Sequence, residues 1–301
     1  MGKRRIISLL LCVFLLVVSI GVGGCGGDKA GSSGKVVIAS KQFAENLIFA
    51  HVAALLIENN TDLKVDISKI GMGPTEMLHP ALAEGEIDLY LEYTGTAWTT
   101  VLKGDMLHDS QEVYEKVREA YRDRFGITCL ETLGFENTFA IVVRKDVAEE
   151  LNLSKISDLA EHPELVFIGD STTFTRPDIY PALQEAYNLD LQQKMVDTTF
   201  KLDAVAEGEG DLTNAYTTDG RLKDYDVVLL EDEKKVFPPY YAIYVIRTEL
   251  LEQHPEIEEA LKPLINAIDE EMAMELNYKV EAENQDPADV AEEFLKSRGL
   301  I

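Results

Sequence analysis

The sequence is short of cysteine and of positive charge, and both shortages narrow what the protein can be. It has 3 cysteines in 301 residues, and its 28 lysines and arginines stand against 54 aspartates and glutamates, a formal net charge of −26. An exterior this acidic repels the phosphates of nucleic acids and offers no cationic face to a membrane surface. We therefore expect no nucleic-acid partner, and any membrane contact has to come from an attached lipid.

Motifs that carry catalytic or metal chemistry are also missing. The five histidines are scattered without metal-ligand spacing, and no Gly-x-Ser-x-Gly elbow or phosphate-binding glycine loop occurs. The segment Gly169–Ser171 superficially resembles a hydrolase nucleophile, but no histidine partner is evident, so a turn with Ser or Asp capping the next element is the better interpretation. Four neighbouring acids are expected on a solvated face: Glu84, Glu86, Asp88 and Glu92. We expect no enzyme, no metal and no cofactor.

The N-terminus has the pattern of an export signal. The basic segment Lys3–Arg5 precedes the uncharged, mostly apolar run Ile6–Ile20, which is short for a membrane span, and small residues follow. Small residues immediately before Cys25 resemble a bacterial lipobox, which implies cleavage before this cysteine and a lipid on its sulfur. An ordinary signal peptide or an uncleaved anchor is the alternative. We expect residues 1–24 to be the signal peptide and residues 25–34 a lipidated, Gly/Ser-rich tether.

Processing at this site would change the charge and the cysteine count. Removing residues 1–24 takes away three basic residues and no acid, so the formal charge changes from −26 to −29. Only Cys25 and Cys129 would remain, and Cys25 would be acylated, so no internal disulfide is expected. Cys129 lies in an apolar run and is expected to be a buried small residue rather than a nucleophile.

Strand-like and helical patterns alternate in two rounds along the rest of the chain. In the first round, apolar patterns predict the strands Lys35–Ser40, Lys64–Ile70 and Ile87–Tyr93. Helices that begin at Gln42 and at Pro74 are predicted between these strands. In the second round the apolar patterns predict the strands Phe139–Val143, Leu165–Ile168, Val227–Leu230 and Ala242–Ile246. A charged helix is predicted over Ser110–Phe125, and the C-terminal part is almost all helix. The alternation predicts an α/β fold of mostly parallel sheets with covering helices.

No linker separates the two rounds, which favours two lobes that share the chain. We expect lobe 1 to consist of residues 35–137 and 243–301, with the C-terminal helices packing back on it, and lobe 2 to consist of residues 138–242. The chain would cross between the lobes near Asn137–Phe139 and again near Pro238–Ala242.

The stretch Ile87–Thr96 predicts where a ligand would bind. Its strand ends at Tyr93 and runs straight into a Thr-Gly-Thr turn. Because the carboxyl ends of strands in open α/β sheets face the ligand crevice, Tyr93 and Thr96 are expected at the mouth of a cleft. One would offer an aromatic face there and the other a hydroxyl group.

Binding chemistry is better represented than catalysis. Four aromatic residues and two cations stand at loop or strand-end positions: Tyr93, Phe139, Tyr216, Tyr240, Lys41 and Arg176. Aromatic faces attract a diffuse cation, with about 2 kcal/mol or more for a favourable desolvated contact. Lysine or arginine beside them would hold a carboxylate, arginine in bidentate fashion. Taken singly, each residue has another interpretation, as core packing for the aromatics and as surface ion pairs for the cations.

Five segments together resemble a known family. They are Ala39–Phe43, Ala83–Thr96, Thr175–Asp178, Tyr216–Asp219 and Pro238–Tyr240, and the Gly-Glu-Ile-Asp and Glu-Tyr-Thr-Gly-Thr elements are the most specific part. In this order they resemble the substrate-binding lipoproteins of ABC transporters for glycine betaine, choline and related osmoprotectants. The resemblance covers the chain from Lys35 to the C-terminus.

The resemblance implies a type II periplasmic binding protein-like fold with two lobes and the ligand cleft between them. Carried over by position, the family's aromatic cage for a quaternary ammonium falls on Tyr93, Tyr216, Tyr240 and Phe139, where tyrosine is usual. Its carboxylate contacts fall on Lys41, Thr96 and Arg176. The sequence leaves open whether Tyr240 or Tyr241 faces the ligand, and Tyr240 is preferred because it directly follows two prolines. The implied protein is a monomer, lipid-anchored on the extracytoplasmic face, that serves an ABC permease.

The leading hypothesis is therefore a receptor for glycine betaine or a related quaternary-ammonium osmoprotectant. A choline-preferring or broad-specificity receptor is the alternative within the same class. An exported hydrolase using Ser171 or a carboxylate pair is a weaker hypothesis. A signalling or structural lipoprotein with a vestigial cleft, for which Phe139 is the only hint, is the last.

Overall fold

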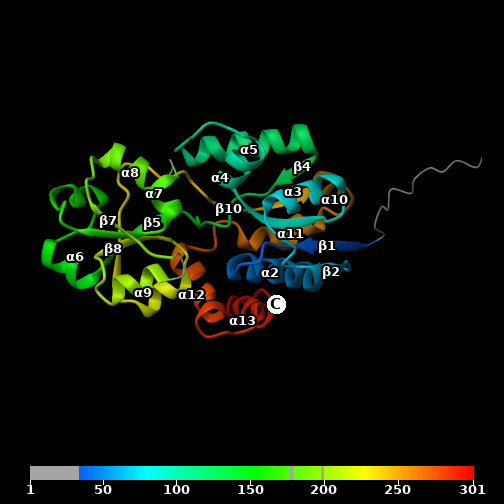
Figure 1. Ribbon diagram of the computed structural model, residues 1–301. Helices are drawn as coiled ribbons and strands as arrows, with labels where there is room; N and C mark the ends of the chain where they lie inside the picture. Colours follow the sequence, from blue (N-terminus) through cyan, green and yellow to red (C-terminus); the bar gives the residue numbers. More distant parts are fainter. Residues whose placement is uncertain (1–33, 177–178, 198–199) are drawn as a thin grey trace, which may run out of the picture. The chain divides into compact units, whose positions relative to one another are not determined.

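The computed structural model describes residues 34–176, 179–197 and 200–301, and residues 34–301 form one compact unit (Figure 1). The predicted signal peptide lies outside the described residues, as do Cys25 and the tether apart from Gly34. Within the described residues no helix is long and apolar enough to cross a membrane.

The first of two sheets has the strand order β2-β1-β3-β10-β4. Its strands are β1 (Lys35–Ala39), β2 (Lys64–Lys69), β3 (Leu89–Tyr93), β4 (Ile127–Cys129) and β10 (Ala242–Arg247). Strand β1 runs parallel to β2 and β3, but β10 is antiparallel to both β3 and β4. Four of its five strands therefore run in one direction, as expected of a mostly parallel sheet, and β10 alone runs against them. Ala242 pairs with Tyr93, so the chain re-enters this sheet at the end where β3 stops and must run back along it.

The second sheet has the order β7-β6-β8-β5-β9 and is also mixed. Its strands are β5 (Phe139–Arg144), β6 (Val166–Gly169), β7 (Gln192–Met195), β8 (Leu212–Tyr216) and β9 (Val227–Leu230). Strand β6 is parallel to β7 and β8, whereas β5 is antiparallel to β8 and β9. The sequence patterns do not predict strands β4, β7 and β8.

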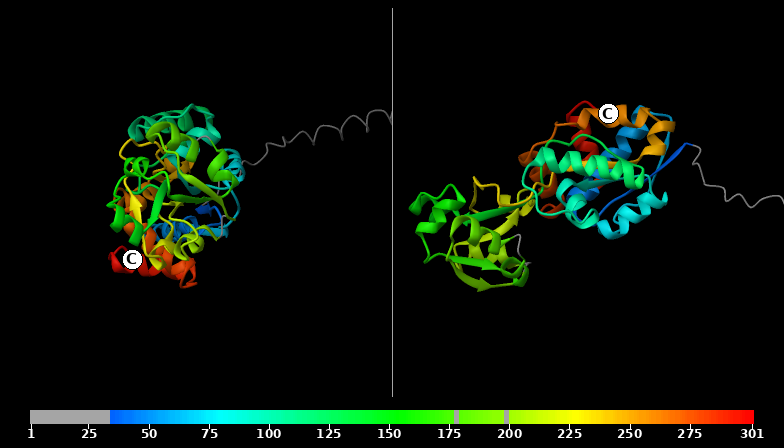
Figure 2. Two further views of the ribbon diagram at one scale, coloured as in Figure 1. Left: turned by 60° about the vertical axis from the view of Figure 1, so that its left-hand side comes forward. Right: turned by 90° about the horizontal axis from the view of Figure 1, so that it is seen from above.

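Helices cover both faces of the first sheet (Figure 1). On one face α2 (Ala44–Asn60) packs with the C-terminal helices around the rings of Phe49, Phe135 and Tyr244. Those helices are α10 (Thr248–Gln253), α11 (Glu256–Leu261), η5 (Lys262–Leu264), α12 (Glu270–Glu281) and α13 (Pro287–Ser297). Figure 2 shows α13, in red, beside the blue α2, so the first and the last long helices of the described residues pack together on this face. The predicted return of the C-terminal helices to the first sheet is what the contacts show.

The other face carries α3 (Thr75–Glu84) and α5 (Ser110–Phe125) over the buried rings of Tyr90 and Tyr121. The side chain of Asp109 caps α5 by accepting a hydrogen bond of 2.8 Å from the Glu112 backbone N–H. The helix ends at Gly126, which has a φ of 66°, the left-handed conformation that favours glycine at this position. The predicted bounds of α5 are therefore confirmed.

The second sheet has its own core around Phe167, Tyr180 and Leu183. The elements that surround this sheet are α6 (Lys145–Leu151), η2 (Ile156–Glu161), α7 (Ser171–Thr175), α8 (Tyr180–Tyr187), α9 (Lys201–Ala206) and η4 (Gly220–Asp224). Asp170 caps α7, accepting 2.7 Å from the Thr173 backbone N–H. The capping interpretation of Gly169–Ser171 is thus confirmed.

The chain passes between the sheets twice, and the two passing segments pair with each other. The Asn137 backbone N–H donates to the Tyr240 carbonyl at 3.1 Å, and Glu136 bridges Tyr241 in antiparallel fashion. The Thr138 hydroxyl adds a bond of 3.1 Å to the Pro238 carbonyl. The pairing brings residues about a hundred positions apart to the same edge of the first sheet.

Candidate functional site

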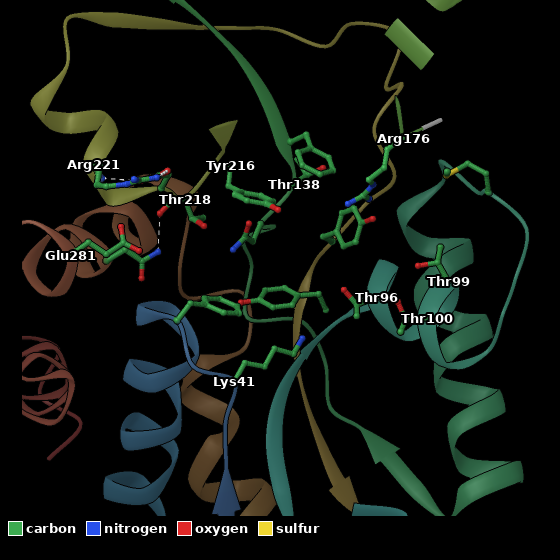
Figure 3. A pocket seen from close by; sticks show the side chains of 18 residues that line it. Lys41, Thr96, Thr99, Thr100, Thr138, Arg176, Tyr216, Thr218, Arg221 and Glu281 are labelled. Carbon is green, nitrogen blue, oxygen red and sulfur yellow. Dashed lines mark hydrogen bonds and ion pairs between the residues drawn. The ribbon is translucent and has the colours of Figure 1, made fainter. Parts of the chain in front are cut away.

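A cavity of about 670 Å³ opens where these segments meet, a size usual for small-molecule sites (Figure 3). Both sheets and helix α12 contribute to its lining. The structure brings all seven residues predicted for the site to this one cavity. The lining consists of Lys41, Phe43, Tyr93, Thr96, Thr99, Thr100, Met106, Asn137, Thr138, Phe139, Arg176, Tyr216, Thr218, Asp219, Arg221, Tyr240, Asn277 and Glu281.

The segment after β3 is helical, which corrects the predicted Thr-Gly-Thr turn. Thr94–Thr96 form the helical turn α4, which continues into η1 (Ala97–Val101), a π-helix. Short π-helical segments are frequent at functional sites. The half-buried Thr96 and its neighbours Thr99 and Thr100 lie on the same side of the cavity in Figure 3. This wall therefore offers several hydroxyl groups rather than one.

Tyr93 ends β3; the residue is 5% exposed and its hydroxyl is fixed by hydrogen bonds. The hydroxyl donates to the Glu45 carboxylate and accepts 3.0 Å from the Asn46 amide nitrogen. Burial, and then the Glu45 charge, raise the pKa of Tyr93 well above its usual value, so the phenol stays neutral. Its polar end is thereby anchored away from the cavity, and the ring remains to line it, stacked at 6.2 Å between centroids on Phe43.

Lys41 is tied into the protein as well as lining the cavity. Its ammonium pairs with the carboxylate of Glu92 and lies 4.7 Å from the centroid of the Tyr93 ring. Glu92 is completely buried and also accepts from the hydroxyls of Thr75 at 2.7 Å and Tyr90 at 3.1 Å. The ammonium therefore already has a carboxylate partner before any ligand arrives.

The prediction that four neighbouring acids lie on a solvated face is wrong for two of them. Glu84 and Glu86 are exposed, but Glu92 and Asp88 are 0% and 4% exposed. Asp88 pairs with Arg247 at 2.9 Å. Both buried acids have a cationic partner, which is what allows a charged group inside a protein.

Phe139 and Tyr216 form the opposite aromatic wall. They face each other on adjacent strands β5 and β8, with ring centroids 5.1 Å apart and planes 25° apart. Phe139 is 7% exposed, whereas Tyr216 is 49% exposed. The guanidinium carbon of Arg176 lies 5.5 Å from the Phe139 centroid. An aromatic pair and an arginine thus stand together on the second sheet's side of the cavity.

Tyr240, rather than Tyr241, lines this cavity. Tyr241 lines a smaller cavity of about 340 Å³ together with Tyr114 and Arg118. The Tyr240 backbone N–H donates to the Glu136 carboxylate at 3.2 Å, and its ring lies against the backbone of Gly95. The close approach of ring and backbone requires glycine at position 95.

Replacing Gly95 with alanine is expected to destabilise the protein by about 1–3 kcal/mol. The new Cβ would lie 2.6 Å from the Pro239 carbonyl oxygen and 2.8 Å from two atoms of the Tyr240 ring. Alanine favours a helical turn by about 1 kcal/mol over glycine, but the oxygen belongs to the backbone and cannot simply rotate away. Urea denaturation measures the loss. An unchanged midpoint would show that Tyr240 is not packed on this glycine.

Sequence reasoning missed the polar end of the cavity. Arg221 is held by Asp219 through two hydrogen bonds of 3.0 and 2.7 Å, and Glu281 accepts 3.1 Å from the Gly220 backbone N–H. In Figure 3, Arg221, Thr218 and Glu281 lie on one side of Tyr216, and Arg176 lies on the other with the threonines of η1 and α4. Thr218 and Asp219 belong to the Tyr216–Asp219 segment that resembles the family, so the sequence gave some indication that they lie near the site. Glu281 is one acid among many and gave none.

Glu281 makes stability depend on pH. Its side chain is exposed at the rim, yet displacement of water by the surrounding protein, and then the Asp219 carboxylate, raise its pKa from 4.5 to about 7. A carboxyl whose pKa is higher in the folded state stabilises that state fully below the unfolded pKa, and the contribution is lost as the pH rises through the folded pKa. We expect the urea midpoint to fall from pH 5 to pH 7 more in the wild type than in Glu281→Gln. Equal slopes would contradict the shifted pKa.

Reactive and metal-binding groups do not gather in the described residues. No cluster of three or more His, Cys, Asp or Glu side chains suited to a metal occurs among them. Cys129 is buried and unpaired, and burial raises the pKa of its thiol to about 12, as expected of an inert core cysteine. Ser171 is exposed on α7 and is not part of the cavity lining.

Two α/β sheets, each with its own helices, and a cavity lined from both define the class of type II periplasmic binding proteins. A crystal structure described as a glycine betaine/carnitine/choline ABC transporter has this fold, with a TM-score of 0.84 and 32% identity over 88% of this chain and 99% of that chain. The predicted fold class is confirmed.

The family model for the substrate binding domain of the ABC-type glycine betaine transport system matches residues 34–297. The carnitine transport binding protein OpuCC of Listeria monocytogenes is 31% identical over 305 residues, covering 99% of this chain and 98% of that protein. The chain belongs to this family of ABC-transporter substrate-binding proteins. Its relatives are substrate-binding proteins, not enzymes: they bind the substrate outside the cytoplasm and work with a membrane permease that transports it. The hydrolase hypothesis is therefore set aside.

A further relative combines both parts of a transporter in one chain. The Helicobacter pylori protein named ergothioneine transport permease/ergothioneine binding protein EgtU is 32% identical over 301 residues, covering 99% of this chain. The match covers 54% of that protein, so this chain spans about half of its length.

Proposed function

We propose that the cavity captures glycine betaine or a related quaternary-ammonium zwitterion for import. The observation that carries the proposal is the meeting of four aromatic residues at one cavity with an arginine beside them: Tyr93, Phe139, Tyr216 and Tyr240 with Arg176. Rings of this kind attract a cation that cannot donate hydrogen bonds. Arg176 and the hydroxyl of Thr96 would bind the carboxylate, with Lys41 contributing its charge from its pair with Glu92.

The same proposal assigns roles to the two halves of the chain. Lobe 1 would be residues 35–137 and 243–301, and lobe 2 residues 138–242. Lys41, Tyr93 and Thr96 then belong to lobe 1, Arg176 and Tyr216 to lobe 2, and Phe139 and Tyr240 to the crossing segments. A ligand that contacts both lobes favours a closed form over an open one, because only the closed form makes every contact. The protein would act as a monomer, anchored to the membrane through a lipid on Cys25.

A betaine with a larger polar group is a second candidate. The cavity extends past Tyr216, on the side away from Arg176. Its lining there includes Thr218, Arg221 and Glu281. Carnitine and ergothioneine, which two relatives are named for, both carry a trimethylammonium group, a carboxylate and a further polar group. A choline-preferring receptor remains the third candidate within this class.

Calorimetric titration with glycine betaine, carnitine, choline and ergothioneine tests the proposal. We expect binding of at least one of the four at a ratio of one ligand per protein, with the ligand recovered unchanged. The Tyr216→Ala variant, which removes the exposed ring, serves as the negative control. Absence of heat for all four ligands would remove the proposed function, and chemical conversion of a ligand would contradict it.

A further inference from the structure

A buried carboxylate lies behind the aromatic wall and belongs to none of the predicted site residues. Glu45, in the first turn of α2, is 1% exposed. It accepts hydrogen bonds from the Tyr93 hydroxyl and from the amide nitrogens of Asn137 and Asn277, the two amides each at 3.1 Å. All three donors line the cavity, so Glu45 is in direct contact with three parts of its wall.

The hydrogen bonds indicate that Glu45 is ionised. Both of its oxygens accept, one from Tyr93 and Asn137 and the other from Asn277. The Asn277 amide nitrogen also donates 2.8 Å to the Thr218 carbonyl, which fixes the amide with its N–H groups toward the acid. Donors that converge on a carboxyl group favour its charged form. In the observed geometry all three groups donate to Glu45, which suits a carboxylate that only accepts.

Within the part of the chain that the structure describes, Glu45 has no cationic partner, in contrast to Glu92 and Asp219 near the same cavity. Glu92 is paired with Lys41, and Asp219 is paired with Arg221. Across residues 34–176, 179–197 and 200–301, no ion pair within 4.0 Å includes Glu45. A buried charge without a counter-ion is costly, and burial weakens its screening by water and salt. Its negative potential therefore acts on the adjacent cavity, where a cation would relieve the cost.

We propose that Glu45 is the fixed counter-charge for the ligand's ammonium group and a determinant of the cavity's preference for cations. Its charge acts from behind the Tyr93 ring, without touching the ligand. This inference rests on the proposed function, because it requires that the ammonium lie against Tyr93. It adds a residue that the aromatic rings and Arg176 do not account for.

Glu45→Gln tests the proposal because glutamine keeps an oxygen that accepts from Tyr93 and removes the charge. We expect the dissociation constants of both glycine betaine and choline to rise about tenfold, since both ligands present the same ammonium to the same charge. Glu58→Gln is the matched control: it removes one exposed acid from the same helix and should change neither constant. Thermal unfolding of the ligand-free variants verifies that both are folded.

Tyr93→Phe separates the charge from the hydrogen bond, and remains informative if Glu45→Gln prevents folding. It keeps the ring and the Glu45 charge and removes the hydroxyl that donates to Glu45, so we expect a smaller loss than tenfold for both ligands. Wild-type affinity in Glu45→Gln, or a loss in Tyr93→Phe of tenfold or more, would overturn the counter-charge and leave Glu45 only a support for the ring. If the wild type binds no quaternary ammonium, the proposed function fails first, and with it this inference.

Discussion

Arg176→Ala should weaken glycine betaine binding about 100-fold and leave choline binding within about threefold of the wild type. A charge-assisted hydrogen bond contributes about 1.5–3 kcal/mol, and 1.4 kcal/mol corresponds to a factor of ten in affinity. Choline has the trimethylammonium group of glycine betaine but no carboxylate, so removing Arg176 should change its affinity little. Titration of the two ligands against wild type and variant measures the split. The split also distinguishes Arg176 from Glu45, whose replacement should affect both ligands equally.

Arg221→Ala is the matched control for this prediction. Arg221 lines the same cavity, but it is paired with Asp219 and lies on the far side of Tyr216 from Arg176. Glycine betaine affinity should fall much less in this variant than in Arg176→Ala. Equal losses in the two variants, or a loss of choline binding in Arg176→Ala as large as that of glycine betaine, would mean that Arg176 does not hold the carboxylate.

Lys41→Met should lower the free energy of unfolding by about 3–5 kcal/mol, the largest stability effect that we expect from a single substitution in the cavity. Methionine preserves most of the side-chain volume but leaves Glu92, which is 0% exposed, without its cationic partner. The hydroxyls of Thr75 and Tyr90 would still donate to Glu92, but hydrogen bonds alone do not neutralise a buried charge. Urea denaturation of the ligand-free proteins measures the difference.

Lys35→Met provides the comparison on the surface of the same sheet. Lys35 pairs with Asp66 at 2.7 Å, but its side chain is 55% exposed, and exposed ion pairs contribute about 0–1 kcal/mol. Glu92→Gln combined with Lys41→Met should recover part of the stability, because the pair is then removed together. If Lys41→Met costs no more than Lys35→Met, the buried pair does not have the structural role assigned to it.

Much of the fold could be predicted from local sequence patterns. The apolar strand Val227–Leu230 and the helix Ser110–Phe125 have in the structure the bounds that their patterns predict. The polar strand β7, Gln-Gln-Lys-Met, has no apolar alternation and could not be recognised, because its pairing with β6 makes it a strand. The antiparallel direction of β10 also depends on where the chain returns to the first sheet, which is a property of the whole topology.

The lining of the cavity could be predicted better than the charges behind it. The predicted aromatic and cationic residues of the lining stand at strand ends or in loops, which local sequence patterns indicate, and the structure places them around one cavity. Glu92 and Glu45 look like ordinary members of an acidic chain. Their burial depends on partners far away in sequence, Lys41 for Glu92 and Asn137 and Asn277 for Glu45. Such pairings are set by tertiary contacts and leave no local pattern.

A crystal structure of the protein with glycine betaine bound tests the central claim most directly. We predict that the trimethylammonium group lies among the rings of Tyr93, Phe139, Tyr216 and Tyr240, with the carboxylate toward Arg176. A ligand bound outside this cavity, or bound in it with the carboxylate against the rings and the ammonium toward Arg176, would contradict the account.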